Sequence, residues 1–121
     1  MKNKNYDDNN IFAKILRGEA KADIVLENKY VFCFQDVFPK APVHVLIIPK
    51  GKFSDINDFS KNATKEQKYS IFEAFEKIIN LFKLEPSGCR IITNYGRDGR
   101  QEVPHLHFHL LGGKDIGKMI I

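Results

Sequence analysis

The chain has 121 residues, 43% of them hydrophobic, and a formal net charge of +4 at pH 7. This length suits one domain with a core of its own and is too short for two. Charges of both signs are mixed along the chain without a Lys/Arg block, so we expect no nucleic acid partner. No apolar run reaches the ~20 residues of a membrane span. We therefore expect no membrane partner.

Two cysteines, Cys33 and Cys89, lie inside apolar runs and belong to no Cys-x-x-Cys pair. This usage is typical of reduced core cysteines and predicts a cytoplasmic protein. Residues 1–10 are polar and Asn-rich, without a signal-peptide core, and predict a disordered arm. The single domain is expected at residues 11–121.

Two helices are predicted by apolar residues at helical spacing. Asn10 can cap the short one, which ends at Gly18. Thr64 opens the long one, and Gln67 three residues later completes a capping box. One stripe of the long helix is expected to pack against a sheet: Ile71, Phe72, Phe75, Ile78, Ile79 and Phe82.

Five apolar segments between turn signals predict strands, at residues 24–27, 30–35, 43–48, 89–93 and 105–111. The polar pair at 28–29 suits a hairpin turn, and residues 36–42 and 94–102 are expected to form loops. The order of these elements predicts an α+β domain with a mostly antiparallel sheet of about five strands, one long helix and one short helix.

Three of the four histidines stand at alternate positions near the C-terminus: His105, His107 and His109. The residues between them, Leu106 and Phe108, are bulky and apolar, which favours a strand. Side chains at alternate positions of a strand emerge from the same face. We therefore expect the three imidazoles to line one face of the last strand.

The residues alone leave three interpretations of this triplet open. The histidines can be structural, held by hydrogen bonds. They can bind Zn²⁺, Cu²⁺ or Ni²⁺, although no cysteine or carboxylate stands next to them apart from Glu102. A neutral imidazole can also attack a phosphoryl centre, with backbone amides of the Gly-containing loop 96–102 near the phosphate. Nearby arginines suit a small anionic ligand such as a nucleotide: Arg90, Arg97 and Arg100.

The run from His105 to Leu111 resembles the signature of the histidine triad (HIT) family, in which histidines alternate with apolar residues. The Leu-Leu-Gly-Gly sequence that ends at Gly113 is similar to the Hint branch, the purine nucleoside phosphoramidases. The likeness extends over roughly residues 10–113. It includes the segments 11–15, 34–44, 47–50 and 101–104, and Asn94.

This resemblance implies a role for each histidine. His107 would be the nucleophile that attacks the α-phosphate of a purine nucleotide substrate, and the carbonyl of His105 would orient its ring. His109 would contact phosphate oxygens, and His44 would support the triad. No cofactor and no metal ion is expected for the chemistry.

The resemblance also implies a nucleotide site. Asp36 would accept hydrogen bonds from the ribose hydroxyls, and Asn94 would lie near the phosphate and ribose. From the residues alone, both equally suit turns. An apolar slot for the purine would be formed by residues that otherwise suit the core: Ile11, Phe12, Ile15, Phe34 and Val37.

Two residues beside Gln101, which the resemblance also assigns to the nucleotide site, depart from the Hint pattern. Arg100 stands where a second glycine is common, and adds charge near the phosphate. Glu102 stands where some members carry serine. A hydroxyl can donate a proton to a leaving amine, whereas a carboxylate must first be protonated. The acid that serves the leaving group therefore stays open.

The sequence thus predicts a HIT-fold enzyme that cleaves purine nucleoside 5′-phosphoramidates through a nucleotidyl-His107 intermediate. The resemblance implies a homodimer, with the long helix and its neighbouring strand at the interface. Two alternatives remain. One is a dinucleoside polyphosphate hydrolase, against which the Leu-Leu-Gly-Gly ending argues. The other is a nucleotide-binding regulatory or protein-interaction module with incidental catalysis.

Overall fold

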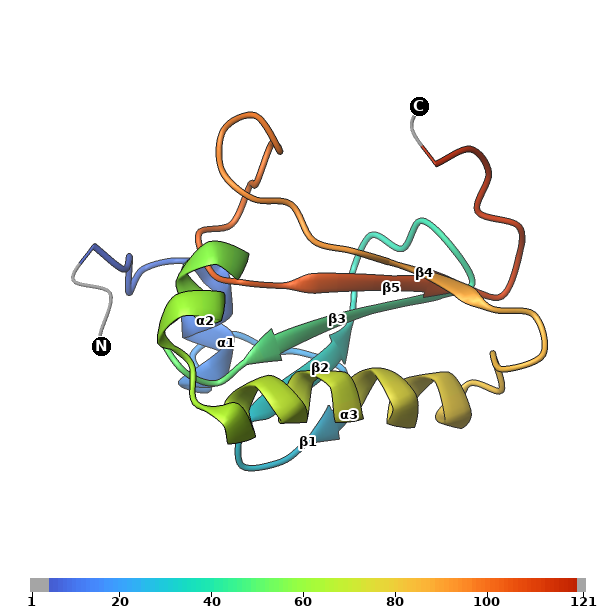
Figure 1. The fold of residues 1–121 in the computed structure, drawn as a ribbon, viewed down its shortest axis with the longest axis horizontal. Coiled ribbons are helices and arrows are strands. Elements are labelled where there is room, and N and C mark those ends of the chain that lie inside the picture. The colour runs from blue at the N-terminus through green and yellow to red at the C-terminus, as the bar shows by residue number, and fades with distance from the viewer. Residues whose placement is uncertain (1–4, 120–121) are drawn as a thin grey trace.

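The computed structural model describes residues 5–119, which form a five-stranded sheet and three helices (Figure 1). The strands are β1 (Ile24–Glu27), β2 (Val31–Gln35), β3 (Val43–Pro49), β4 (Cys89–Ile92) and β5 (Phe108–Gly112). The helices are α1 (Ile11–Leu16), α2 (Ile56–Asn62) and α3 (Lys65–Leu81). None of these helices is both long and apolar enough to cross a bilayer.

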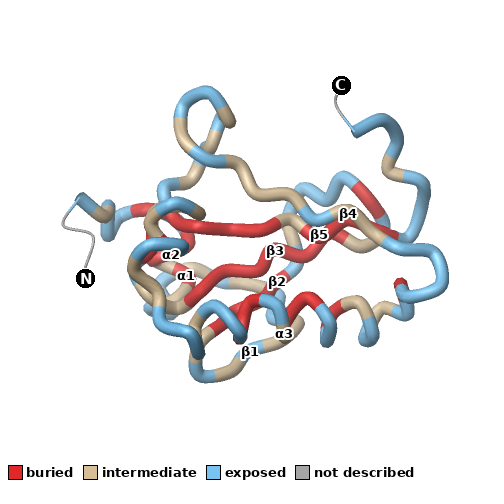
Figure 2. Tube along the Cα trace, in the orientation of Figure 1, coloured by how far each residue is buried: buried red, intermediate tan, exposed pale blue. Residues whose placement is uncertain are grey.

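The sheet has the order β1-β2-β3-β5-β4, and every neighbouring pair of strands is antiparallel. This confirms the α+β fold and the predicted sheet. β3 lies at the centre and is buried from His44 to Pro49, as its nearly continuous apolar sequence requires (Figure 2). Its partner β5 carries the end of the histidine run.

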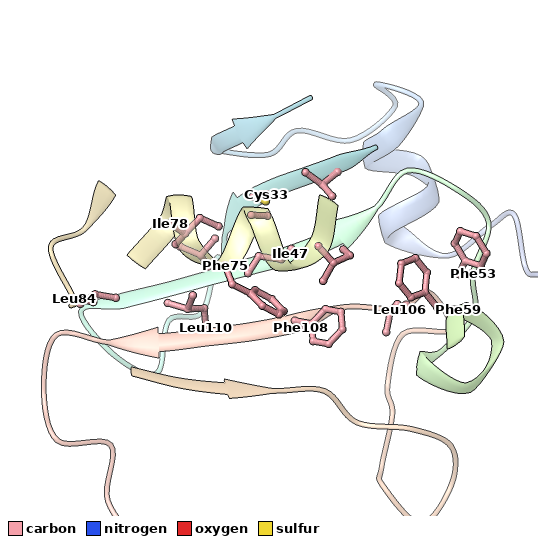
Figure 3. Packing of buried hydrophobic residues seen from close by; sticks show 14 residues of the cluster. Cys33, Ile47, Phe53, Phe59, Phe75, Ile78, Leu84, Leu106, Phe108 and Leu110 are labelled. Carbon is pink, nitrogen blue, oxygen red and sulfur yellow. The ribbon is translucent and has the colours of Figure 1, made fainter. Parts of the chain in front are cut away.

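The two faces of the sheet are covered by different helices because side chains alternate along each strand. On one face, α3 packs on Cys33 and Ile47 through Phe75 and Ile78 (Figure 3). On the other face, α1 contributes a smaller apolar cluster of strand and helix residues: Phe12, Ile15, Phe32, Phe34, Leu46 and Ile48.

Both predicted helix caps are confirmed. The Asn10 side chain accepts a hydrogen bond from the amide of Ala13 at the start of α1. The Thr64–Gln67 capping box is complete at the start of α3. The prediction that Phe72 packs against the sheet is wrong, since this side chain is 72% exposed. Helix α2 was not predicted, because only Phe59 among its residues is buried and it therefore has no apolar stripe.

Part of the N-terminal segment differs from the predicted disordered arm. Tyr6 contacts the ring of His105, and Asn10 caps α1. These contacts hold residues 6–10 against the domain. Residues 1–4 of the predicted arm lie outside the described residues.

The cysteines occupy the apolar positions expected of them. Cys33 is fully buried in β2 and Cys89 is half-buried in β4, and both are free thiols. Burial raises the pKa of Cys33 to about 12. Because the thiolate is the reactive form, this thiol is chemically inert at neutral pH.

The histidine run begins before β5 rather than inside it. The amide of Leu106 donates to the carbonyl of Phe53, 2.8 Å away, and the hydroxyl of Thr93 donates to the carbonyl of His107, also at 2.8 Å. These bonds replace the strand ladder, so the predicted start of the strand at residue 105 is wrong. The alternation of side chains persists, and both apolar residues join the core: Leu106 lies beside Phe53 and Phe59, and Phe108 packs on Phe75 of α3 (Figure 3).

Leu106 therefore anchors the histidine run through a fully buried side chain. We expect Leu106→Ala to lower the free energy of unfolding by about 2–5 kcal/mol, because it leaves a cavity. Leu106→Met, which keeps the volume, is expected to cost less than about 1.5 kcal/mol. Urea unfolding followed by circular dichroism measures both. Equal losses in the two variants would contradict the packing described here.

Candidate active site

A cavity of about 520 Å³ lies beside α1, on the sheet face opposite α3. Its apolar lining includes all the residues predicted for the purine slot: Ile11, Phe12, Ile15, Phe34 and Val37. Its polar lining includes most of the other predicted site residues: Asp36, Asn94, Arg100, Glu102, His107 and His109. The structure thus brings together residues from five separate parts of the chain.

His107 has one ring nitrogen tied to the backbone. Its Nδ1 lies 2.7 Å from the carbonyl oxygen of His105. A carbonyl only accepts hydrogen bonds, so Nδ1 must hold the proton and Nε2 must hold the lone pair. Burial lowers the pKa of His107, which keeps the ring neutral at neutral pH. His107 thus presents an unprotonated Nε2, the form in which an imidazole is a nucleophile, beside the cavity.

His105 is fully buried and does not line the cavity. Its Nε2 donates to the carbonyl of Pro49 at 2.9 Å, and its Nδ1 accepts from the hydroxyl of Tyr6 at 2.5 Å. Burial lowers its pKa to about 4. Sequence reasoning missed Tyr6, because a contact between residues 99 positions apart leaves no local pattern.

His44 and His109 are joined by a hydrogen bond of 2.9 Å between Nε2 of the first and Nδ1 of the second. The backbone amide of Lys40 donates to Nδ1 of His44 at 3.0 Å. In the neutral ring of His44 the proton must therefore sit on Nε2, which donates to His109. His109 in turn keeps its proton on Nε2. Burial lowers the pKa of both rings, that of His109 to about 4.

Asp36, His44 and His109 place possible metal ligands within 4.8 Å of one another. A histidine that binds a metal ordinarily donates its second ring N–H to an acceptor. Here the second nitrogen of His44 faces a donor, the Lys40 amide. A neutral His44 therefore turns a protonated nitrogen toward the cluster, an arrangement that fits proton donation better than metal ligation.

The loop before the histidines is held by Gln101, whose side chain does not line the cavity. Its amide oxygen accepts from the amide of Gly96, and its amide nitrogen donates to the carbonyls of Ser54 and Val103. The structure thus gives Gln101 contacts that shape the loop, whereas the sequence assigned it to the nucleotide. Arg100 has a φ of 59°, a conformation that favours glycine. This agrees with the glycine common there in the Hint pattern.

Comparisons with known proteins identify the family of this chain. The sequence matches the HIT domain over residues 17–116. The chain belongs to the HIT family. It is 44% identical over 117 residues to a 13.2 kDa HIT-like protein of Azospirillum brasilense, covering 97% of this chain and 96% of that protein. The resemblance stated from the sequence is thereby confirmed at the level of the family.

Two further relatives bear on this HIT protein. The purine nucleoside phosphoramidase of Escherichia coli K12 is 41% identical over 111 residues, covering 91% of this chain and 92% of that protein. The structure of a HIT family hydrolase from Clostridium thermocellum superposes with a TM-score of 0.84 at 38% identity. That match covers 95% of this chain and 99% of the other.

The buried histidines make stability depend on pH. All four have pKa values below the ordinary 6.5, those of His105 and His109 near 4. Well above pH 6.5 they are neutral in both the folded and the unfolded state and contribute no slope. As the pH falls from 6.5 toward 4, the unfolded chain takes up protons that the folded protein excludes. We therefore expect the free energy of unfolding to decrease across this window.

Urea unfolding at about pH 7, 5.5 and 4.5 measures this decrease. His109→Asn removes one of the titrating rings and is expected to make the decrease shallower. An equal pH dependence in the wild type and this variant would contradict the neutral state assigned to His109.

Proposed function

We propose that this HIT protein hydrolyses purine nucleoside 5′-phosphoramidates, such as AMP linked to an amine, through a nucleotidyl-His107 intermediate. One observation carries the proposal. The hydrogen bond from Nδ1 of His107 to the His105 carbonyl leaves the Nε2 lone pair on a ring that lines the cavity. The 41% identity to the Escherichia coli purine nucleoside phosphoramidase supports the substrate class.

In the first step, Nε2 of His107 attacks the α-phosphorus. The substrate P–N bond breaks, and its electron pair leaves with the amine nitrogen, which takes a proton. The ring of His107 then bears a positive charge, while its Nδ1–H remains bonded to the His105 carbonyl. Burial lowers the pKa of His107, and the carboxylates of Asp36 and Glu102 act in the opposite direction. The same carboxylates would stabilise the cationic ring.

In the second step, water attacks the phosphorus and the bond from phosphorus to Nε2 breaks. The electron pair returns to the ring, the water gives up one proton to solvent, and the product is a nucleoside 5′-monophosphate. Two displacements through a covalent intermediate replace a single hydrolysis that is harder.

His109 offers a hydrogen-bond donor to the phosphate. The hydrogen bonds from the Lys40 amide to His44 and from His44 to His109 leave the proton of His109 on Nε2, and the ring lines the cavity. This N–H can donate a hydrogen bond to a phosphate oxygen and stabilise the charge that develops there. A neutral imidazole does not give up this proton, so the leaving amine takes its proton from solvent.

The remaining cavity residues suit a nucleotide. The volume of about 520 Å³ falls within the range of small-molecule pockets. Phe12 and Phe34 pack edge to face in its lining, where the purine would lie. The carboxylate of Asp36 accepts from the amide of Phe38 at 2.8 Å, which holds it in place for the ribose hydroxyls.

Turnover of adenosine 5′-phosphoramidate by purified protein tests this function. We expect His107→Ala to lower kcat by about 10³-fold or more, because the covalent route is lost. His109→Asn should retain more activity than His107→Ala, and a chelator should leave the wild type unchanged. The enzyme hypothesis fails if the wild type is no faster than His107→Ala. Nucleotide binding without turnover would instead support a regulatory module, and faster cleavage of a dinucleoside polyphosphate would support the alternative hydrolase.

We also propose a homodimer formed through α3 and β4. Large apolar side chains are exposed on α3, with Tyr69 at 67% and Phe72 at 72% exposure, and Ile91 of β4 is 40% exposed. β4 is an edge strand, so its outer hydrogen-bonding groups have no strand partner within the described sheet. Exposed apolar side chains and an open strand edge both suit burial by a second copy.

Light scattering after size-exclusion chromatography measures the assembly. We expect the wild type to be dimeric and Phe72→Glu to be monomeric, because a buried unpaired charge destabilises an apolar interface. Ile24→Glu, at an exposed position of the opposite edge strand, is the matched control and should leave the dimer intact. A monomeric wild type, or a dimer that survives Phe72→Glu, would refute this interface.

A further inference from the structure

The segment before α1 reaches the buried end of the histidine run through Tyr6. The Tyr6 ring meets the ring of His105 edge-on, with centroids 5.6 Å apart. The Tyr6 hydroxyl lies 2.5 Å from Nδ1 of His105, and the side-chain amide of Asn10 donates to the same hydroxyl at 3.0 Å. Since the amide occupies the oxygen as an acceptor, the phenolic proton is free to point at His105.

His105 needs a donor at this place. Its Nε2–H donates to the Pro49 carbonyl, so its Nδ1 is an acceptor inside a fully buried ring. A buried acceptor without a partner is costly, and the Tyr6 hydroxyl supplies the partner. Burial raises the pKa of Tyr6, so the phenol keeps its proton well above neutral pH.

The same residue, His105, also holds the proton of His107 on Nδ1. Its ring is fixed at both nitrogens, by Pro49 on one side and Tyr6 on the other. Its backbone carbonyl receives the proton of His107 at 2.7 Å. The ring that Tyr6 and Pro49 hold and the carbonyl that binds the His107 proton thus belong to one residue.

We propose that Tyr6 is a positioning residue: its hydroxyl holds the His105 ring, whose tautomer the Pro49 carbonyl sets, in the orientation that keeps the His105 carbonyl against Nδ1–H of His107. The effect on turnover rests on the proposed phosphoramidase function, whereas the effect on the hydrogen bonds of His105 and His107 does not. The N-terminal segment is in this way part of the active-site framework although it does not line the cavity.

The segment also forms an ion pair at the surface, which does not reach the histidines. Asp8 forms an ion pair with Lys52 at 2.8 Å, and both side chains are more than half exposed. Exposed ion pairs contribute little to stability. Asp8→Asn therefore changes the same segment without changing the hydrogen bond to His105, and it is the matched control.

Tyr6→Phe tests the proposal, because it keeps the ring against His105 and removes only the hydroxyl. We expect kcat to fall about fivefold at an unchanged KM, since one hydrogen bond that orients the nucleophile is lost. Imidazole ¹⁵N spectra should show Nδ1 of His105 losing its hydrogen bond and the signals of His107 shifting, because the carbonyl that binds its Nδ1–H is displaced. Asp8→Asn should match the wild type in both measurements.

Three results would overturn the proposal. Wild-type signals for His107 in Tyr6→Phe would show that the hydroxyl does not position the nucleophile. An unchanged kcat with a lowered melting temperature would make Tyr6 purely structural, and an equal loss of kcat in Asp8→Asn would remove the role of the hydroxyl. If the wild type turns over no phosphoramidate, the proposed function fails, and the spectra still decide whether Tyr6 positions the histidines.

Discussion

The backbone fixes where the protons of the histidines lie. The Lys40 amide faces Nδ1 of His44, the Pro49 carbonyl faces Nε2 of His105, and the His105 carbonyl faces Nδ1 of His107. Because an amide only donates and a carbonyl only accepts, each neutral ring has one permitted tautomer. Burial keeps the rings neutral at pH 7 by lowering their pKa values. The nucleophilic lone pair of His107 and the N–H of His109 follow from these bonds.

The fold supplies those backbone groups from separate elements. The Pro49 carbonyl comes from the end of the central strand β3, and the Lys40 amide comes from the loop before it. Leu106 and Phe108 pack into the core on the α3 face of the sheet, which turns His107 between them toward the cavity and α1 (Figure 3). The core on one face of the sheet thus positions the polar site on the other. Figure 2 shows this buried centre along β3 and β5.

Much of this site was predictable because its signals are local. The alternation at 105–109 places the three histidines on one side whether or not the segment forms a strand, and the caps at Asn10 and Thr64 depend on residues three positions apart. The tautomer of His105 was not predictable, since its partners lie far away in sequence. Pro49 is 56 positions from His105, and Tyr6 is 99. The contacts of Gln101 were not predictable for the same reason, because its partner at Ser54 is 47 positions away.

The central claim is that His107, alone among the histidines, forms the covalent bond to phosphorus. Mass spectrometry of the protein quenched during turnover and digested without acid tests it directly. The account predicts a nucleoside monophosphoryl adduct that fragmentation assigns to His107, and none after His107→Ala. An adduct on His109 or His44, or rapid turnover without any trapped adduct, would contradict it.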